Sequence, residues 1–120
     1  MRSTASAGKI GEEYAVTLLK RKGYKILTRN FRSKFGEIDI VATENHTLVF
    51  VEVKTRWSPK FGNPEEAVTP RKLAHLERTA HYFKLLNPKS PDASRIDVVA
   101  TEVRDGKVTA ARILKNVTGF

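Results

Sequence analysis

Apolar and β-branched residues dominate two runs of the chain between residues 37 and 57, which a short polar link separates. The runs are Glu37–Thr43 and Thr47–Trp57, and the link Glu44-Asn45-His46 has an asparagine at its centre. This combination is typical of two antiparallel strands joined by a tight turn. Both faces of the second run are apolar, which predicts a strand near the centre of a sheet.

Helical and strand-like patterns precede this predicted hairpin. Apolar positions at helical spacing predict a helix over about residues 9–22, and alternation predicts a strand over residues 24–32. Glu12 and Glu13 fall in the first turn of that helix, where the helix dipole favours carboxylates. Residues 1–7 are small and polar and are expected to be disordered.

A second helix and two further strands are predicted after the hairpin. Thr69-Pro70 is a typical helix start, and the apolar stripe behind it continues to about residue 86. The runs Arg95–Val103 and Lys107–Val117 are predicted strands around an Asp-Gly turn. The helix is expected to bury the members of its apolar stripe, which are Leu73, Leu76, Ala80, Phe83 and Leu86.

Chain length and the order of the elements limit the fold. A chain of 120 residues is long enough for one domain with a real core and too short for two. Consecutive hairpins predict an antiparallel meander, and the second helix allows a crossover to a fourth, parallel strand. We therefore expect one α/β domain over residues 1–120, with a mixed sheet and helices packed on it.

Four charged residues interrupt the predicted hairpin, where a purely structural strand would have none: Glu37, Asp39, Glu52 and Lys54. If the hairpin closes with Glu44 opposite Thr47, two of these carboxylates meet. Asp39 then faces Glu52 across the strands, with Cβ atoms about 4.5–5.5 Å apart. Such a pair repels by roughly 4 kcal/mol at a surface-like dielectric, which a structural strand would avoid.

A divalent cation would remove this repulsion, because carboxylate and carbonyl oxygens are the ligands that Mg²⁺ and Mn²⁺ prefer. Lys54, two residues after Glu52, would then stand beside the metal and a scissile phosphate. The structural alternative is that Asp39 and Glu52 lie on a solvated face while Lys54 pairs with Glu37. Charges on a central strand are costly without a function, and this favours the metal site.

The motif EIDIVA at residues 37–42 is echoed by RIDVVA at residues 95–100. Because the surroundings of the two motifs do not match, we interpret them as shared strand chemistry rather than as an internal repeat. Asp97 in the second motif is expected to pair with a basic neighbour and not to bind a metal.

The net charge indicates the class of partner. A formal charge of +9 and a pI near 10.0 are typical of a domain that meets polyanions, most often nucleic acid. Seven cations and no acid lie between Lys20 and Lys34, as in a rim that contacts phosphates, although an anionic membrane surface or ribosomal RNA would attract the same block. The candidate nucleic-acid contacts are Lys25, Arg29, Arg32, Lys34, Arg56 and Lys72.

Other features of the sequence argue against export and against zinc. No apolar run approaches the ~20 residues needed to cross a bilayer, and the N-terminus has no apolar signal core. The absence of cysteine excludes disulfides and thiolate zinc sites, and the spacing of His75 and His81 is not that of a ligand pair. We expect a cytoplasmic protein with no membrane partner.

Two short motifs resemble those of a nuclease superfamily. Ile-Asp at 38–39 and Glu-Val-Lys at 52–54 resemble the PD-(D/E)xK pattern of restriction endonucleases and archaeal Holliday junction resolvases, with Ile38 in place of the proline. A longer match is more specific: GKIGEEYAVTLLKRKGYKILTRNFRSKFGEIDIVA, followed by LVFVEVKTR, resembles the YraN family of small, endonuclease-like bacterial proteins. The similarity continues through FGNPEEAVTPRKLAHL and RIDVVA and covers nearly the whole chain.

The resemblance implies a restriction-endonuclease-like αβββαβ core with one extra C-terminal strand. It implies that Asp39, Glu52 and the Val53 carbonyl hold a Mg²⁺ or Mn²⁺ ion, and it adds Glu12 to the site. Lys54 would orient the attacking water or stabilise charge on the phosphate. The implied activity is hydrolysis of phosphodiester bonds in DNA, such as branched or damaged DNA. Analogy with the dimeric resolvases suggests a homodimer.

Two other functions stay open at this point. A non-catalytic nucleic-acid-binding module on a nuclease fold would use the cationic block and would not need an intact metal site. A protein-interaction adaptor would need an exposed apolar patch.

Overall fold

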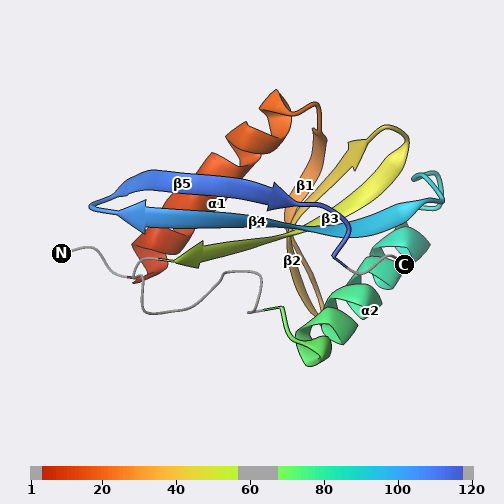
Figure 1. Ribbon diagram of the computed structural model, residues 1–120. Helices are drawn as coiled ribbons and strands as arrows, with labels where there is room; N and C mark the ends of the chain where they lie inside the picture. Colours follow the sequence, from red (N-terminus) through yellow and green to blue (C-terminus); the bar gives the residue numbers. More distant parts are fainter. Residues whose placement is uncertain (1–3, 57–67, 118–120) are drawn as a thin grey trace.

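The computed structural model describes residues 4–56 and 68–117, which form a five-stranded sheet and two helices (Figure 1). The elements follow the chain in the order α1 (Thr4–Arg21), β1 (Lys25–Ser33), β2 (Gly36–Glu44), β3 (Thr47–Arg56), α2 (Pro70–Leu86), β4 (Ser94–Arg104) and β5 (Lys107–Leu114). The strands lie in the order β1-β2-β3-β4-β5, with β3 and β4 parallel and the other neighbours antiparallel. The predicted mixed α/β sheet is confirmed, and it is a restriction-endonuclease-like core with an extra C-terminal strand.

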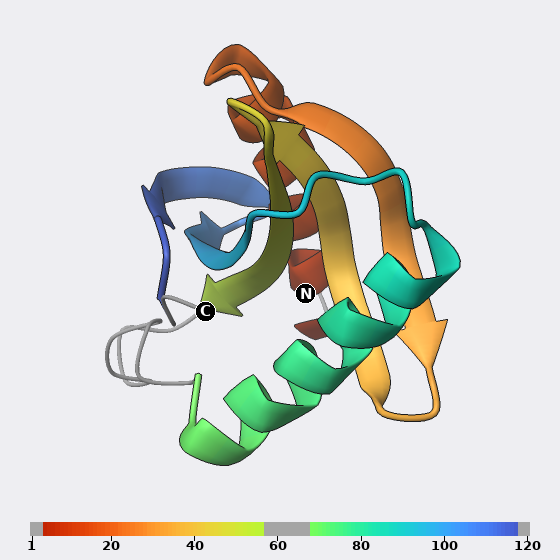
Figure 2. The ribbon, with the colours of Figure 1, turned by 90° about the vertical axis from the view of Figure 1, so that its right-hand side faces the viewer.

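The two helices cover opposite faces of the sheet (Figures 1 and 2). Ala15 and Leu19 of α1 pack into one buried cluster with Ile40, Ala42, Val49, Val51 and Val99 of the strands. The second buried cluster joins α2 to the other face and contains Ile38, Val41, Leu48, Phe50, Leu76, Ala80, Phe83 and Ile96. Both faces of β3 are therefore buried, as its apolar sequence predicts.

The second helix begins where the sequence predicts but buries a shorter stripe. Thr69 caps it, with its Oγ1 accepting the Lys72 N–H at 3.2 Å, and Pro70 is the first helical residue. The expected burial of Leu86 is wrong, because this last helical residue is 55% exposed and lies beside Leu27 at a surface pocket. None of the described helices is long and apolar enough to span a bilayer.

The first helix begins at Thr4, earlier than its apolar pattern indicates. The disorder expected for residues 1–7 is therefore not found for residues 4–7, and Ala7 is buried; residues 1–3 lie outside the described part of the chain. This start also places Glu12 and Glu13 in the middle of the helix. The interpretation of these glutamates as partners of the dipole in the first turn is wrong, because the dipole acts only within that turn.

Gly11 lies where α1 approaches the sheet most closely. A Cβ atom at Gly11 would overlap the side chains of Thr55 and Thr101, whereas nothing lies within 4 Å of one at Gly8. We expect Gly11→Ala to destabilise the protein by about 1–3 kcal/mol, although alanine is the better helix former. Gly8→Ala, the matched control in the same helix, is expected to be neutral or stabilising by up to about 1 kcal/mol. Urea denaturation measures the difference, and equal midpoints for the two variants would contradict this packing.

The hairpin of β2 and β3 closes with Glu44 opposite Thr47, which confirms the predicted register. Backbone pairing continues only to Ile40 opposite Val51, and beyond this point the two strands run apart (Figure 2). The pairing of Glu37 with Lys54, which the structural alternative requires, lies beyond that end. It is wrong, because Glu37 instead accepts a hydrogen bond from Arg32 Nε of β1 at 3.0 Å.

The second strand also changes face where it leaves β3. Ile38 packs in the cluster beneath α2, whereas Ile40 packs in the cluster beneath α1. Residues two apart in a regular strand share a face, so the chain must twist between them. Asp39 lies at this twist, and the facing residue of β1, Asn30, has a positive φ of 54° and no partner in the strand pairing. The strands thus open beside the first predicted metal ligand.

Candidate metal centre and nucleic-acid interface

Asp39 and Glu52 lie together at the point where β2 and β3 separate. The Asp39 carboxylate takes over the role of the missing backbone partner, since its Oδ2 accepts the Val53 N–H at 2.8 Å. Glu52, the neighbouring residue on β3, has its carboxyl group within hydrogen-bonding reach of Asp39. Glu52 is 8% exposed and Asp39 is half-buried, so two acids with limited access to water lie side by side. The proximity that the hairpin register predicts is present.

The electrostatics of this pair are unfavourable for two ionised carboxylates. Burial and the neighbouring charge of Glu52 raise the pKa of Asp39 to about 8, with a further contribution from Glu12. The Val53 N–H hydrogen bond opposes this rise. Within residues 4–56 and 68–117, no lysine or arginine forms an ion pair with Asp39. Asp39 therefore holds its proton near neutral pH, and a cation can bind in place of that proton.

The start of α2 forms a third side of the site. Lys72 Nζ lies 3.3 Å from Glu52 Oε1, and both residues line a pocket of about 400 Å³ together with Asp39 and His75. His75 Nδ1 lies 3.1 Å from the carbonyl oxygen of Phe35, and because a carbonyl oxygen only accepts, this nitrogen carries the hydrogen. The bond ties α2 to the turn between β1 and β2, which also lines the pocket.

The remaining predicted site residues lie around this centre at different places. Glu12, on α1, accepts a hydrogen bond from Arg29 Nη2 at 3.1 Å and is near enough to Asp39 to raise its pKa. Lys54 is half-buried on β3, does not line the pocket, and forms no ion pair within the described part of the chain. Val53 contributes the N–H that binds Asp39.

The donor set fits a hard divalent cation that keeps part of its water shell. Among the described residues, no three His, Asp or Glu side chains are close enough to hold a metal by themselves. Mg²⁺ is commonly bound through one or two carboxylates, with waters and substrate phosphates completing the octahedron. Asp39 and Glu52 would supply the two carboxylates of such a site, whereas a zinc-like site with only protein ligands is not present in residues 4–56 and 68–117.

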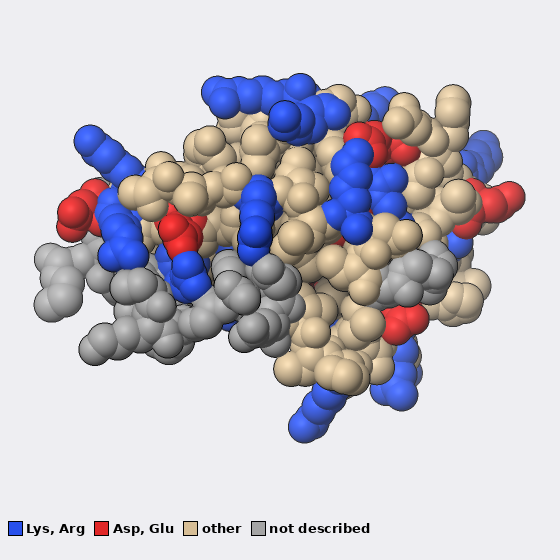
Figure 3. Space-filling view, viewed as in Figure 1, with Lys and Arg blue, Asp and Glu red and all other residues tan. Residues whose placement is uncertain are grey.

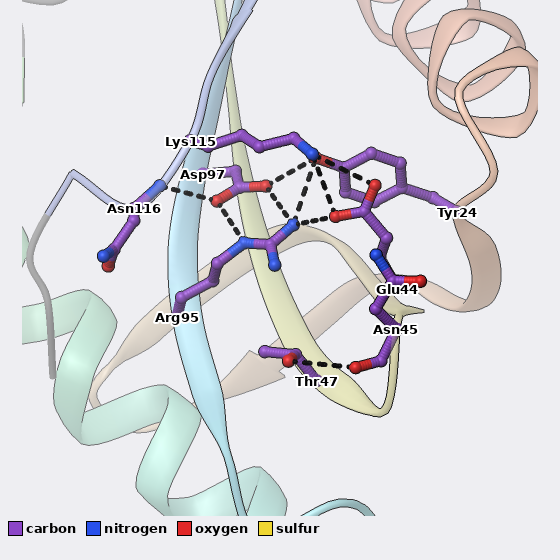
Figure 4. A network of polar contacts seen from close by, with 8 residues as sticks. All are labelled: Tyr24, Glu44, Asn45, Thr47, Arg95, Asp97, Lys115 and Asn116. Carbon is purple, nitrogen blue, oxygen red and sulfur yellow. Dashed lines mark hydrogen bonds and ion pairs between the residues drawn. The ribbon is translucent and has the colours of Figure 1, made fainter.

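The second Ile-Asp motif shows how this fold holds a structural aspartate (Figure 4). Asp97 is fully buried, and its Oδ1 accepts hydrogen bonds from Arg95 Nε and the Asn116 N–H, each at 2.9 Å. Its Oδ2 accepts from the Tyr24 hydroxyl at 2.8 Å. Glu44 completes the network by accepting from Arg95 Nη2 at 2.6 Å. The predicted pairing of Asp97 with a basic neighbour is confirmed, and among the described residues Asp39 has no comparable set of donors.

Comparison with known proteins places the chain in a family. A family model described as "Uncharacterised protein family UPF0102" matches residues 11–101. The chain belongs to the UPF0102 family. This confirms the resemblance to the YraN family, whose label the UPF0102 match supports.

Three relatives illustrate the similarity. The UPF0102 protein of Syntrophomonas wolfei is 50% identical over 97 residues, which cover 81% of this chain and 84% of the relative. That of Caldicellulosiruptor saccharolyticus is 49% identical over 110 residues, covering 91% and 93%. That of Mycolicibacterium vanbaalenii is 38% identical over 115 residues, covering 96% and 95%.

The cationic surface of this UPF0102 protein is partly neutralised by its own acids. Lysine and arginine side chains outnumber acidic ones on the face seen in Figure 3 and spread across it. Four of the candidate nucleic-acid contacts have carboxylate partners: Arg29 binds Glu12 and Glu13, Arg32 binds Glu37, Arg56 binds Glu102, and Lys72 binds Glu52. Lys25 and Lys34 are exposed on and just after β1, and Lys34 Nζ lies 5.3 Å from the centre of the Phe35 ring. Of the candidate nucleic-acid contacts, these two lysines are the more available.

The ion pair between Lys72 and Glu52 and the hydrogen bond between His75 and the Phe35 carbonyl are not predicted from the sequence. The sequence of α2 does contain a signal for the contact of Lys72 with the sheet. Lys72 precedes Leu76 by four residues, so the two share a face of α2, and Leu76 is buried against the sheet. A lysine one turn before a buried leucine can reach the strands with its ammonium group, although much of its side chain stays exposed.

Proposed function

We propose that this UPF0102 protein is a metal-dependent nuclease that hydrolyses phosphodiester bonds in DNA, with branched or damaged DNA as the substrate class. The observation that supports it is the pair of Asp39 and Glu52 in one pocket. The fold gives the buried Asp97 a full set of donors but leaves Asp39 beside a second acid. Such an arrangement is costly unless a cation binds there.

The roles of the residues follow from their positions. Asp39 and Glu52 would hold a Mg²⁺ or Mn²⁺ ion, with the Val53 carbonyl as a further oxygen ligand. A bound ion supplies Lewis-acid stabilisation of charge on the phosphate. Lys54 would add a positive charge along β3, and Glu12 would increase the negative potential that attracts the ion.

The basic surface would hold the nucleic acid. Exposed lysines such as Lys25 and Lys34 contact phosphates and fix the strand relative to the pocket without reading its sequence. Arg29 and Arg32 already have carboxylate partners, so we expect each to contribute less than a free lysine. A homodimer belongs to this proposal through the analogy with resolvases, and light scattering of the purified protein tests it.

Cleavage of junction, flap and single-stranded DNA in the presence of Mn²⁺ or Mg²⁺ tests the proposal. We expect the wild-type protein to cut at least one of these substrates and Glu52→Gln to lose about 10²-fold or more in rate, because the neutral amide binds the cation poorly. Asp105→Asn is the control, since Asp105 lies in the exposed turn between β4 and β5 and the substitution removes the same charge.

Two outcomes would refute the nuclease assignment: no cleavage of any of the substrates, or equal cleavage by Glu52→Gln and wild type. The net charge of +9 supports a non-catalytic nucleic-acid-binding module as the second candidate. That candidate predicts DNA binding that weakens steeply with salt and is unchanged in Glu52→Gln.

A further inference from the structure

Lys72 is the lysine that reaches the carboxylate pair. Its Nζ lies 3.3 Å from Glu52 Oε1, and it lines the pocket that contains Asp39. We propose that Lys72 is a positioning residue of the metal site: its ammonium balances Glu52 while no divalent ion is bound, and it moves to the substrate phosphate when the ion is bound. This inference rests on the proposed nuclease function. It assigns the role of the positively charged side chain in the pocket to a lysine of α2.

The helix cap holds the backbone of Lys72, whereas its side chain is partly exposed. The Lys72 N–H binds the capping hydroxyl of Thr69 at 3.2 Å, and Pro70 fixes the first helical residue. The Lys72 side chain is 44% exposed, whereas that of Glu52 is 10% exposed. The ammonium therefore enters from the pocket mouth towards a buried carboxylate, on a flexible four-carbon chain.

In this proposal, Lys72 and a divalent ion compete for Glu52. A buried carboxylate needs a positive partner, and within the described residues its ion pair is with Lys72. A divalent ion between Asp39 and Glu52 would satisfy both carboxylates and would repel the ammonium at the same time. A half-exposed ion pair is weak, so the ion can displace Lys72 at little cost.

A displaced Lys72 stays within reach of the pocket, because the Thr69 cap and Pro70 fix its backbone at the start of α2. The ligand that suits a mobile ammonium next to a bound divalent cation is a phosphate oxygen with its negative charge. Lys54 does not line the pocket, although it lies closer to Glu52 along the chain. The geometry thus gives Lys72 the role of contacting the phosphate at the carboxylate pair.

Calorimetric titration with Mn²⁺ alone, combined with cleavage at saturating Mn²⁺, tests this inference. We expect Lys72→Met to bind Mn²⁺ about three- to tenfold more tightly than wild type, because the competing ammonium is gone. The same variant should cleave DNA at least about tenfold more slowly, because the phosphate loses a positive contact. Lys72→Arg keeps the charge and should return both values most of the way to wild type. Arg71→Met removes a charge from the same turn at an exposed position and should change neither.

The opposite signs of the two effects separate this role from a structural one, which would weaken binding and cleavage together. If Lys72→Met binds Mn²⁺ no more tightly than wild type, or cleaves at the wild-type rate, the inference is overturned and the nuclease proposal stands. If the wild-type protein binds no Mn²⁺, the nuclease proposal fails and this inference fails with it.

Discussion

Asp39→Asn is expected to make the metal-free protein more stable at alkaline pH and to abolish its stabilisation by Mn²⁺. In the wild-type protein, burial and the charge of Glu52 raise the pKa of Asp39 to about 8. Folding therefore becomes less favourable when Asp39 has to ionise. An asparagine keeps the shape of the side chain and can still accept the Val53 N–H through its amide oxygen, and it never carries the charge.

The sign of the pH dependence follows from the direction of the shift. A carboxyl group that holds its proton more tightly in the folded state favours folding most below its ordinary pKa of about 3.9. That contribution is lost as the pH rises towards the raised pKa of about 8. The stability of Asp39→Asn minus that of wild type should thus grow between about pH 4 and pH 8. Even a shift of two units in the pKa of Asp39 corresponds to a difference of about 3 kcal/mol in the free energy of unfolding.

Denaturation in urea at about pH 5 and about pH 9, with and without Mn²⁺, measures both effects. Taking the difference between variant and wild type cancels the titration of all other groups. Mn²⁺ at 100 times its dissociation constant should stabilise the wild type by about 2.7 kcal/mol and the variant by nearly nothing. A variant that is less stable than wild type at pH 9 would show that Asp39 has a structural role, and a variant that Mn²⁺ still stabilises would show that Asp39 does not hold the ion.

The same substitution in the second Ile-Asp motif is expected to have the opposite effect. Asp97→Asn should destabilise the protein by about 3–5 kcal/mol, because it leaves the buried Arg95 guanidinium without one of its two carboxylates. The amide also presents an N–H group to donors, since Arg95, Tyr24 and Asn116 all donate to Asp97. Burial raises the pKa of Tyr24, and its bond to Asp97 raises it further, so Tyr24 remains a donor over the whole accessible pH range.

Urea denaturation near neutral pH compares Asp97→Asn with Asp39→Asn directly. Tyr24→Phe removes a single donor from the same network and should cost only about 1–2 kcal/mol, so it gives a measurable value if Asp97→Asn does not fold. A loss below about 1 kcal/mol for Asp97→Asn would mean that the network contributes little to the stability of the fold.

The comparison of these two aspartates shows how far the sequence predicts the site. Strand alternation and the polar link fix the hairpin register, and the register brings Asp39 to Glu52. Both motifs read Ile-Asp followed by apolar residues, so local pattern cannot separate them. What separates them is the set of donors from distant parts of the chain: Tyr24 and Asn116 surround Asp97, whereas the opening of β2 from β3 leaves Asp39 with Val53.

Features that depend on packing between elements are not predictable from periodicity. The change of face between Ile38 and Ile40 breaks the two-residue alternation on which the strand prediction rests. The contact of Lys72 with Glu52 depends on where α2 docks, and a helix pattern gives the buried face but not the strand it meets. The early start of α1 was missed because small residues before Lys9 carry almost no apolar signal.

The edge strands of the sheet, β1 and β5, have a consequence for any variant that removes positive charge. The outer strands carry cations along their length, including Lys25 and Arg32 on β1 and Lys107 and Arg112 on β5. Charged side chains on an outer strand prevent neighbouring molecules from adding to it and so oppose aggregation. Replacing these cations by neutral residues would weaken that protection, so the monodispersity of such a variant should be measured together with its affinity for DNA.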